Sequence, residues 1–350
     1  MTTPTWDTFC CTFSEQHKSV DELLNFRYKP FSIVSLISAS LGVFGAIYQI
    51  VPIHETMQRR SVLSGERQRK IIKLLAIADL FACLGIIVRS VMWIIFYENR
   101  TESQRMNDHR LACALISFWI MYFYTSTYMW TVCYAIDVYF TLKENAWKFK
   151  YYHLISWGIS LFYVACEFLI LYVPDFKCHS KMPLVLAHYV LTFIAILIPM
   201  LLNPILYALA SSQARQIIQG RLGRYTDLER SLVNKLKMKF SHIVIVFYVC
   251  WLPNIISNFI LWSEWKRLHE WHVDLRGFII GLWYFMAIVN PLQAVLNSVV
   301  YRGWANCSNL KMFFANMFRN RITLGIIPDD SAENERSDEV NGREQLINRA

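Results

Sequence analysis

The sequence has few charged residues: they make up 17% of its 350 residues, whereas soluble domains usually carry about 25%. It also has no CxxC pair, no zinc-type Cys/His spacing, and no Ser/His/Asp or phosphate-loop arrangement. We therefore expect no enzyme activity, no metal site and no cofactor. The hydrophobic residues, 55% of the total, lie in long runs, which predicts a polytopic membrane protein.

The apolar runs predict an all-α membrane protein folded as a seven-transmembrane helix bundle. The expected spans are residues 31–51, 71–96, 112–140, 152–173, 184–209, 240–262 and 277–300. Before them, residues 1–30 read as an N-terminal segment without a signal peptide. After them, we expect an amphipathic surface helix at 303–318 and a disordered tail at 319–350. No internal repeat is visible, which argues against the inverted repeats of many transporters.

The Lys and Arg residues predict the orientation of the bundle. The loops after spans one, three and five, together with the tail, hold 22 of them, against 11 on the opposite side. This bias places the tail in the cytosol and the N-terminus in a lumen or outside the cell. It also explains the net charge of +9 without nucleic-acid binding. Asn99 starts a glycosylation sequon, which falls on the lumenal side, and the most basic cytosolic loop is expected at 210–239.

Three charged residues lie inside the spans, where a charge is costly and marks a functional hypothesis. They are Asp79, Arg89 and Glu167. Arg89 and Glu167 both fall in the outer halves of their spans, so they could hold the two ends of a zwitterionic ligand. The alternative is that they pair with neighbouring groups purely for folding. The other residues that we expect to contact a ligand are Tyr124, His188 and Trp251.

Span six contains a tryptophan close to a proline, Trp251 and Pro253. Proline removes a backbone hydrogen bond and kinks a helix, so the indole can act as a lever when a ligand presses on it. Plain packing is the alternative interpretation.

Two cysteines fall on the outer side, Cys113 at the start of span three and Cys178 in the loop after span four. An oxidising lumen would allow them to form a disulfide. The alternative is two free cysteines.

Several elements resemble rhodopsin-like G protein-coupled receptors. They are LAIAD (75–79), the pair Cys113 and Cys178, Asp137 at 24 residues past Cys113, Trp157, CWLP (250–253) and Asn290-Pro291. The resemblance implies a heterotrimeric G protein as the partner, with arrestin as a further one. It also implies that switching and coupling use Asp79, Asp137, Tyr139, Trp251, Pro253, Asn290 and Pro291.

The chain resembles the ocular albinism type 1 receptor family more specifically. The resembling strings are TFCC (8–11), DLFACLGIIVRSVMW (79–93), CYAIDVY (133–139), NPIL (203–206), QGRLGRYTDLER (219–230), CWLPNII (250–256) and NPLQAVLNSVVYRGWANC (290–307). This resemblance implies a receptor of late endosomes, lysosomes or melanosomes, and also of the plasma membrane. Its small-molecule ligand is then tyrosine or a tyrosine-derived metabolite such as L-DOPA, and its signal serves organelle biogenesis.

Two cytosolic features bear on sorting and on membrane lipid. Ile217-Ile218 lies where this family carries a dileucine-like signal for sorting adaptors, although an apolar pair beside a bilayer can also simply touch it. Cys307, beside the expected surface helix, is a candidate for palmitoylation.

The chain departs from the receptor pattern in three places. Val138 replaces the arginine expected between Asp137 and Tyr139, Ala294 stands where a tyrosine is usual, and span one offers no asparagine to bind Asp79. Two other functions therefore stay open. One is a transporter or channel that uses the charged residues inside the spans, and the other is a non-signalling organelle scaffold.

Overall fold

The computed structural model describes residues 26–51, 66–96, 110–143, 145, 147–172, 182–222, 227–263 and 273–302. Within these ranges the chain is helical. The helices are α2 (Tyr28–Ile50), α3 (Glu66–Phe96), α5 (Arg110–Leu142), α6 (Phe149–His153), η2 (Leu154–Ile159), α7 (Ser160–Tyr172), α8 (Met182–Leu222), α9 (Asp227–Ser263) and α10 (Val273–Arg302). The short helices α6 and η2 continue into α7, and the described chain has seven helical segments long and apolar enough to cross a membrane. The predicted seven-helix bundle is confirmed, and the protein is a multi-pass membrane protein.

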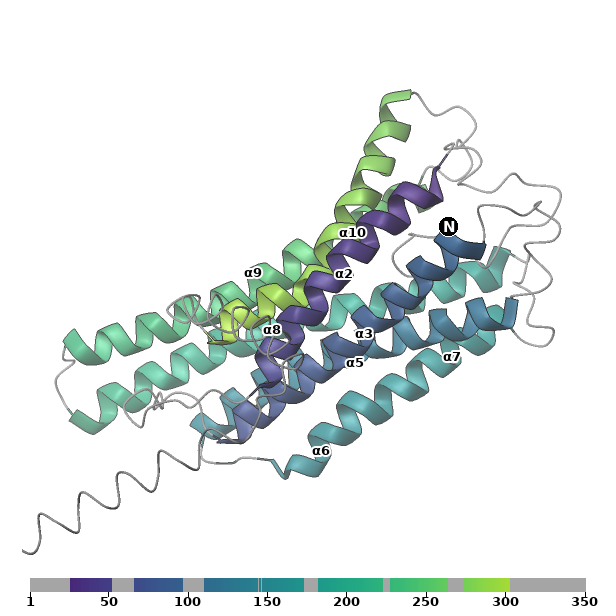
Figure 1. Cartoon of the computed structure of the whole chain (residues 1–350). Coiled ribbons are helices and arrows are strands. Elements are labelled where there is room, and N and C mark those ends of the chain that lie inside the picture. Colours follow the sequence, from purple (N-terminus) through teal and green to yellow (C-terminus); the bar gives the residue numbers. More distant parts are fainter. Residues whose placement is uncertain are drawn as a thin grey trace, which may run out of the picture. The chain divides into compact units, whose positions relative to one another are not determined.

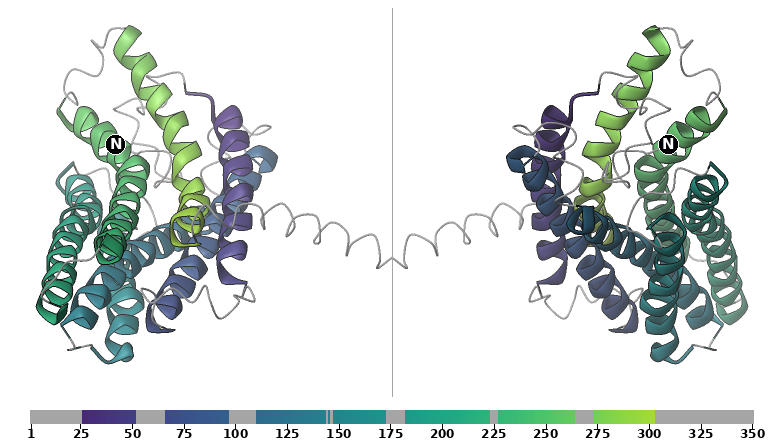
Figure 2. Two further views of the ribbon diagram at one scale, coloured as in Figure 1. Left: turned by 90° about the vertical axis from the view of Figure 1, so that its left-hand side faces the viewer. Right: turned by 90° about the vertical axis from the view of Figure 1, so that its right-hand side faces the viewer.

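Neighbouring helices in the bundle form a closed series of contacts (Figure 1). The third span, α5, packs against α3, η2, α7 and α8, which is the largest number of packed neighbours for any described helix. On the other side, α10 lies between α2 and α9 (Figure 2). A side chain on α5 can therefore meet residues from both halves of the sequence.

The first span packs closely because it presents glycines to its neighbours. A Cβ on Gly42 would lie 2.5 Å from the carbonyl oxygen of Pro291, and one on Gly45 would lie 2.6 Å from the Cα of Val295. Small residues at helix contacts allow such close backbone approach in membranes. This contact positions the part of α10 that carries two of the predicted switch residues, Asn290 and Pro291.

The outer surface of the spans is apolar, whereas many buried side chains are polar. Large hydrophobic side chains are exposed on each span, for example Ile37, Leu84, Leu115, Phe162, Leu201, Ile245 and Phe278. Buried serines, threonines and asparagines gather inside instead. This distribution suits a lipid environment, where polar groups must find partners within the bundle.

The helices around the predicted loop 210–239 are longer than the spans predicted from hydropathy. α8 continues to Leu222 and α9 begins at Asp227, so most of that stretch is helical. The end of an apolar run marks where a helix leaves the hydrocarbon, not where it stops. Residues 210–219 contain no proline or glycine to end the helix.

Several sequence predictions lie outside the described residues and stay predictions. They concern Asn99, Cys178, Cys307, the N-terminal segment 1–25, the surface helix 303–318 and the tail 319–350. Cys113 is disulfide-bonded. The four cysteines described as free are Cys83, Cys133, Cys166 and Cys250, so the partner of Cys113 lies outside the described part of the chain.

Candidate functional site

A buried carboxylate, Asp79, joins three helices at the middle of the bundle. Its Oδ1 accepts a hydrogen bond of 3.0 Å from Thr127 Oγ1 on α5. Its Oδ2 accepts one of 3.0 Å from Asn297 Nδ2 on α10. Each oxygen of the acid thus has a donor, which limits the large cost of burying it. The arrangement links the packing of α3 to that of α5 and α10.

The sequence analysis missed Asn297, although a signal for it was present. Asn297 and Tyr301 have the Asn-x-x-x-Tyr spacing of the element sought at Asn290-Pro291, with Ser298 in place of the proline. The asparagine expected in span one is therefore not needed, because α10 supplies the amide that binds Asp79.

Asn290, a predicted switch residue of α10, forms an amide pair with Asn254 of α9, which follows Pro253 and was not predicted. Asn254 Nδ2 donates to Asn290 Oδ1 at 3.3 Å, and Asn290 Nδ2 donates back to Asn254 Oδ1 at 3.4 Å. Pro291 lies inside α10, and its carbonyl accepts a 3.6 Å contact from Cys83 Sγ on α3. The helices α9 and α10 are therefore joined beside Pro253 and Pro291.

Trp251 lies at the centre of an aromatic cluster. Its ring makes edge-to-face contacts with Tyr124 and Tyr128 of α5, at centroid distances of 4.9 and 4.7 Å. Its Nε1 donates a 2.6 Å hydrogen bond to Gln293 Oε1 on α10. Tyr124 and Trp251, both predicted to contact a ligand, are thus brought together, and the indole is held by two other helices.

The outer acid, Glu167, lies at the junction of α7 and α8 and is 1% exposed. Its Oε1 accepts a 3.2 Å hydrogen bond from Thr192 Oγ1, which also contacts the carbonyl of His188 at 3.1 Å. The structure therefore brings Glu167 and His188 together through Thr192, and their contact with a ligand stays a prediction.

The structure does not bring Arg89 against Glu167. Arg89 is buried on α3, and among the described residues no ion pair joins it to Glu167. The two helices that carry them both pack against α5. The joint role of Arg89 and Glu167 in holding a zwitterion stays a prediction.

Asp137, at the cytosolic end of α5, binds a cation that the sequence analysis missed. Arg67 of α3 places both Nε and Nη2 at 2.6 Å from Asp137 Oδ1. The Asp137 side chain is 1% exposed and that of Arg67 31%. Position 138 lacks the expected arginine, and Asp137 is paired instead with an arginine from the start of the second span.

Near this pair, tyrosines from three helices gather, and a lysine lies beside two of them. The rings of Tyr134 and Tyr301 lie 5.2 Å apart and those of Tyr134 and Tyr207 lie 6.5 Å apart. Lys239 Nζ of α9 lies 6.0 Å from the rings of both Tyr134 and Tyr301. The hydroxyls of Tyr207 and Tyr301 have no hydrogen-bond partner among the described residues. A lysine of α9 thus touches α5 and α10 at the end where α9 would move in a receptor.

The remaining predicted residues that the structure describes all lie in helices. Tyr139 of α5 is half-buried, and Lys143 Nζ lies 4.7 Å from its ring. Pro253 is inside α9. Ile217 and Ile218 belong to α8, not to a loop.

The chain matches a known protein family over most of its length. The family model described as Ocular albinism type 1 protein matches residues 1–338. The chain belongs to the ocular albinism type 1 protein family. This family assignment confirms the resemblance found in the sequence.

Three curated relatives extend this comparison. The human protein named G-protein coupled receptor 143 is 28% identical over 324 residues, covering 88% of this chain and 78% of the relative. Cyclic AMP receptor-like protein A of Dictyostelium discoideum is 26% identical over 82% of this chain and 65% of the relative. Cyclic AMP receptor-like protein C of the same organism is 25% identical over 54% of each chain. This member of the ocular albinism type 1 family is thus similar to proteins named as receptors.

Proposed function

We propose that this protein is a G protein-coupled receptor that responds to tyrosine or a tyrosine-derived metabolite and signals through heterotrimeric G proteins. The observation that carries the proposal is a series of buried polar contacts that α10 makes with α9 and α3. Gln293 binds Trp251, Asn290 pairs with Asn254, and Asn297 holds Asp79. Kinship to proteins named as receptors supports the same function.

The proposed mechanism is a shift between two populated arrangements of the bundle. A ligand in the outer half presses on Tyr124 and through its ring on Trp251. Because Trp251 is bonded to Gln293, movement of the indole changes the contact between α9 and α10. At the cytosolic end, outward movement of α9 separates Lys239 from the Tyr134 and Tyr301 rings and opens a surface for the G protein.

The proposed ligand site uses the two charged residues of the outer half, Arg89 of α3 and Glu167 of α7, whose helices both pack against α5. An amino acid directs its carboxylate toward Arg89 and its ammonium toward Glu167. His188 lies on the Glu167 side. The support for an ammonium at Glu167 is that its side-chain partner among the described residues is the neutral hydroxyl of Thr192, so a cation would compensate a costly buried acid.

The proposed location is a late endosome, lysosome or melanosome, from which the receptor serves organelle biogenesis. Sorting adaptors would read Ile217-Ile218, and arrestin would bind the same cytosolic face as the G protein. The test is co-localisation of the tagged chain with markers of these organelles, before and after Ile217→Ala/Ile218→Ala. A chain that stays in the endoplasmic reticulum while correctly folded would contradict the location.

The function is tested by nucleotide exchange on purified G proteins. The full chain in lipid nanodiscs is mixed with L-tyrosine or L-DOPA, and exchange is expected to accelerate when the ligand binds. Arg89→Ala and Glu167→Gln are expected to lose the response, whereas Arg276→Ala and Glu66→Gln, with the same chemical changes elsewhere, keep it. Ligand binding that is unchanged in both folded site variants would rule out the proposed ligand site.

A non-signalling scaffold is the second candidate, and one observation favours it. Val138 stands where the receptor class has an arginine, and the neighbouring Asp137 is already neutralised by Arg67. A scaffold would bind its ligand or partners without accelerating nucleotide exchange on any G protein. The exchange assay therefore separates the two candidates.

A further inference from the structure

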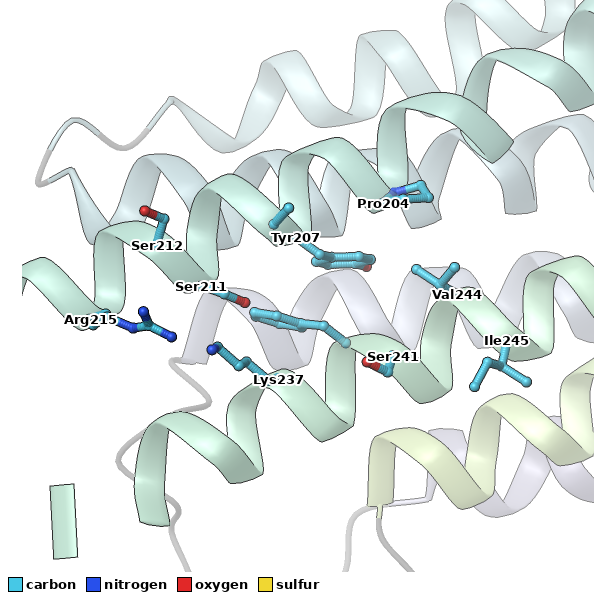
Figure 3. Close-up of a pocket in the computed structure, with 11 residues that line it drawn as sticks. Pro204, Tyr207, Ser211, Ser212, Arg215, Lys237, Ser241, Val244 and Ile245 are labelled. Atoms are coloured by element: carbon cyan, nitrogen blue, oxygen red, sulfur yellow. The ribbon is translucent and has the colours of Figure 1, made fainter. Parts of the chain in front are cut away.

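The cytosolic halves of α8 and α9 leave a cavity of about 690 Å³ between them (Figure 3). Its floor is formed by buried residues, among them Tyr207 and Phe240, whose rings stack at 4.6 Å. Ligand pockets in proteins usually have volumes of about 300–1,000 Å³. The cavity is therefore large enough for part of an organic molecule.

This cavity opens on the surface that faces lipid. Ala208 and Ser212 on α8, and Ser241 and Ile245 on α9, line it and are exposed. The same outer surface continues with exposed apolar side chains such as Val249. A molecule can therefore enter the cavity sideways from the bilayer.

Two cations lie at one end of the cavity, Arg215 of α8 and Lys237 of α9 (Figure 3). No acidic residue is among those that line it. Neither cation takes part in an ion pair within the described part of the chain. The positive-inside bias places this end in the cytosol, so the cavity presents two available charges at the cytosolic membrane surface.

The length of the cavity matches one leaflet of a bilayer. Pro204 and Arg215 both line it, and eleven residues of helix span roughly 16 Å. Half of a bilayer's hydrocarbon core is about 15 Å. A phosphate at Arg215 thus allows an acyl chain to extend along the cavity to Pro204.

We propose that this cavity binds an anionic phospholipid of the cytosolic leaflet. Arg215 and Lys237 hold the phosphate and headgroup, while one acyl chain lies over Tyr207 and Phe240. A cytosolic peptide fits less well, because its backbone polar groups would need partners at membrane depth. The inference goes beyond the proposed function, since it requires neither an agonist nor a G protein.

The charge contribution is tested by lipid binding to the purified full chain. Native mass spectrometry compares phosphatidylserine with phosphatidylcholine of the same acyl chains. We expect phosphatidylserine to bind roughly tenfold or more tightly, because basic residues at the surface attract anionic lipid. Arg215→Gln/Lys237→Gln is expected to remove this preference. The matched control, Lys148→Gln/Lys150→Gln, removes two exposed cytosolic charges outside the cavity and is expected to keep it.

The acyl-chain contribution is tested with a substitution that keeps both cations. Ser241→Trp fills the cavity and is expected to weaken phosphatidylserine binding at least fivefold, whereas Val249→Trp, on the same lipid-facing surface outside it, leaves binding unchanged. Soluble glycerophosphoserine is expected not to compete. Thermal unfolding of each variant shows that it is folded.

Three results would overturn the proposal. They are a lipid preference that survives Arg215→Gln/Lys237→Gln, an equal loss in the Lys148→Gln/Lys150→Gln control, and full binding after Ser241→Trp. Competition by glycerophosphoserine would assign the cations to a soluble anion instead, and would also reject a lipid site.

Discussion

Two buried acids, Asp137 and Glu167, occupy opposite ends of the bundle and have different partners. Asp137 at the cytosolic end has a direct arginine partner in Arg67. Glu167 in the outer half has the hydroxyl of Thr192. Removing one member of a buried ion pair strongly destabilises a protein, whereas a hydrogen bond to a neutral group contributes less. The inner acid therefore serves the fold, while the outer acid is suited to receive a cation.

The largest expected effect comes from removing the cation of the inner acid. Arg67→Gln leaves Asp137 buried without its charge partner and is expected to cost about 3 kcal/mol. This figure is at the low end of the range for buried pairs because the arginine is 31% exposed. Thermal unfolding of the purified protein measures the loss.

The control for this substitution is an exposed pair on the same helix. Lys70→Gln breaks the 2.9 Å ion pair with Glu66, whose side chain is 77% exposed, and is expected to leave the unfolding temperature nearly unchanged, because exposed ion pairs contribute little. The double variant Arg67→Gln/Asp137→Asn is expected to recover most of the stability. An equal loss for Arg67→Gln and Lys70→Gln would show that the inner pair is not structural.

An intermediate effect is expected where Asp79 joins the helices. Asn297→Ala removes the donor to Oδ2 and leaves that oxygen buried, which is expected to cost about 2 kcal/mol. Asn290→Ala, on the same helix, removes an amide pair with longer hydrogen bonds and is expected to cost less. Thermal unfolding measures both, and the reverse order would contradict the role assigned to Asn297.

The smallest effect on stability is expected for the outer acid. Glu167→Gln keeps an oxygen that accepts the Thr192 hydrogen bond, so stability should change by less than about 1 kcal/mol. Affinity for a ligand ammonium should fall about tenfold or more, because its charged partner is lost. Isothermal titration with L-DOPA measures the affinity. A large loss of stability with unchanged affinity would make Glu167 a structural residue like Asp137.

The sequence predicted the bundle well because long apolar runs are a strong local signal. The seven spans, the buried position of Asp79 and the disulfide-bonded state of Cys113 all agree with it. The helix ends around 210–239 were predicted poorly, because hydropathy indicates where the chain crosses the membrane and not where a helix begins or ends.

Partners between helices were harder to predict than the helices themselves. Which basic residue faces Asp137 depends on packing of α3 against α5, so Arg67 was not singled out among the five basic residues of its region. The sequence places Arg89 and Glu167 at a similar depth in the membrane. It does not show that α5 packs between the helices that carry them. Asn297 was predictable from its spacing to Tyr301, which preserves the pattern without the proline.

In the proposed mechanism, a ligand contact in the outer half moves α9 at the cytosolic end. The distance between spin labels at Met238→Cys on α9 and Lys150→Cys on α6, both exposed sites, reports this movement. With L-DOPA bound, we expect a shift to longer distances that Glu167→Gln abolishes. A distance distribution that stays unchanged when the ligand is bound would contradict it.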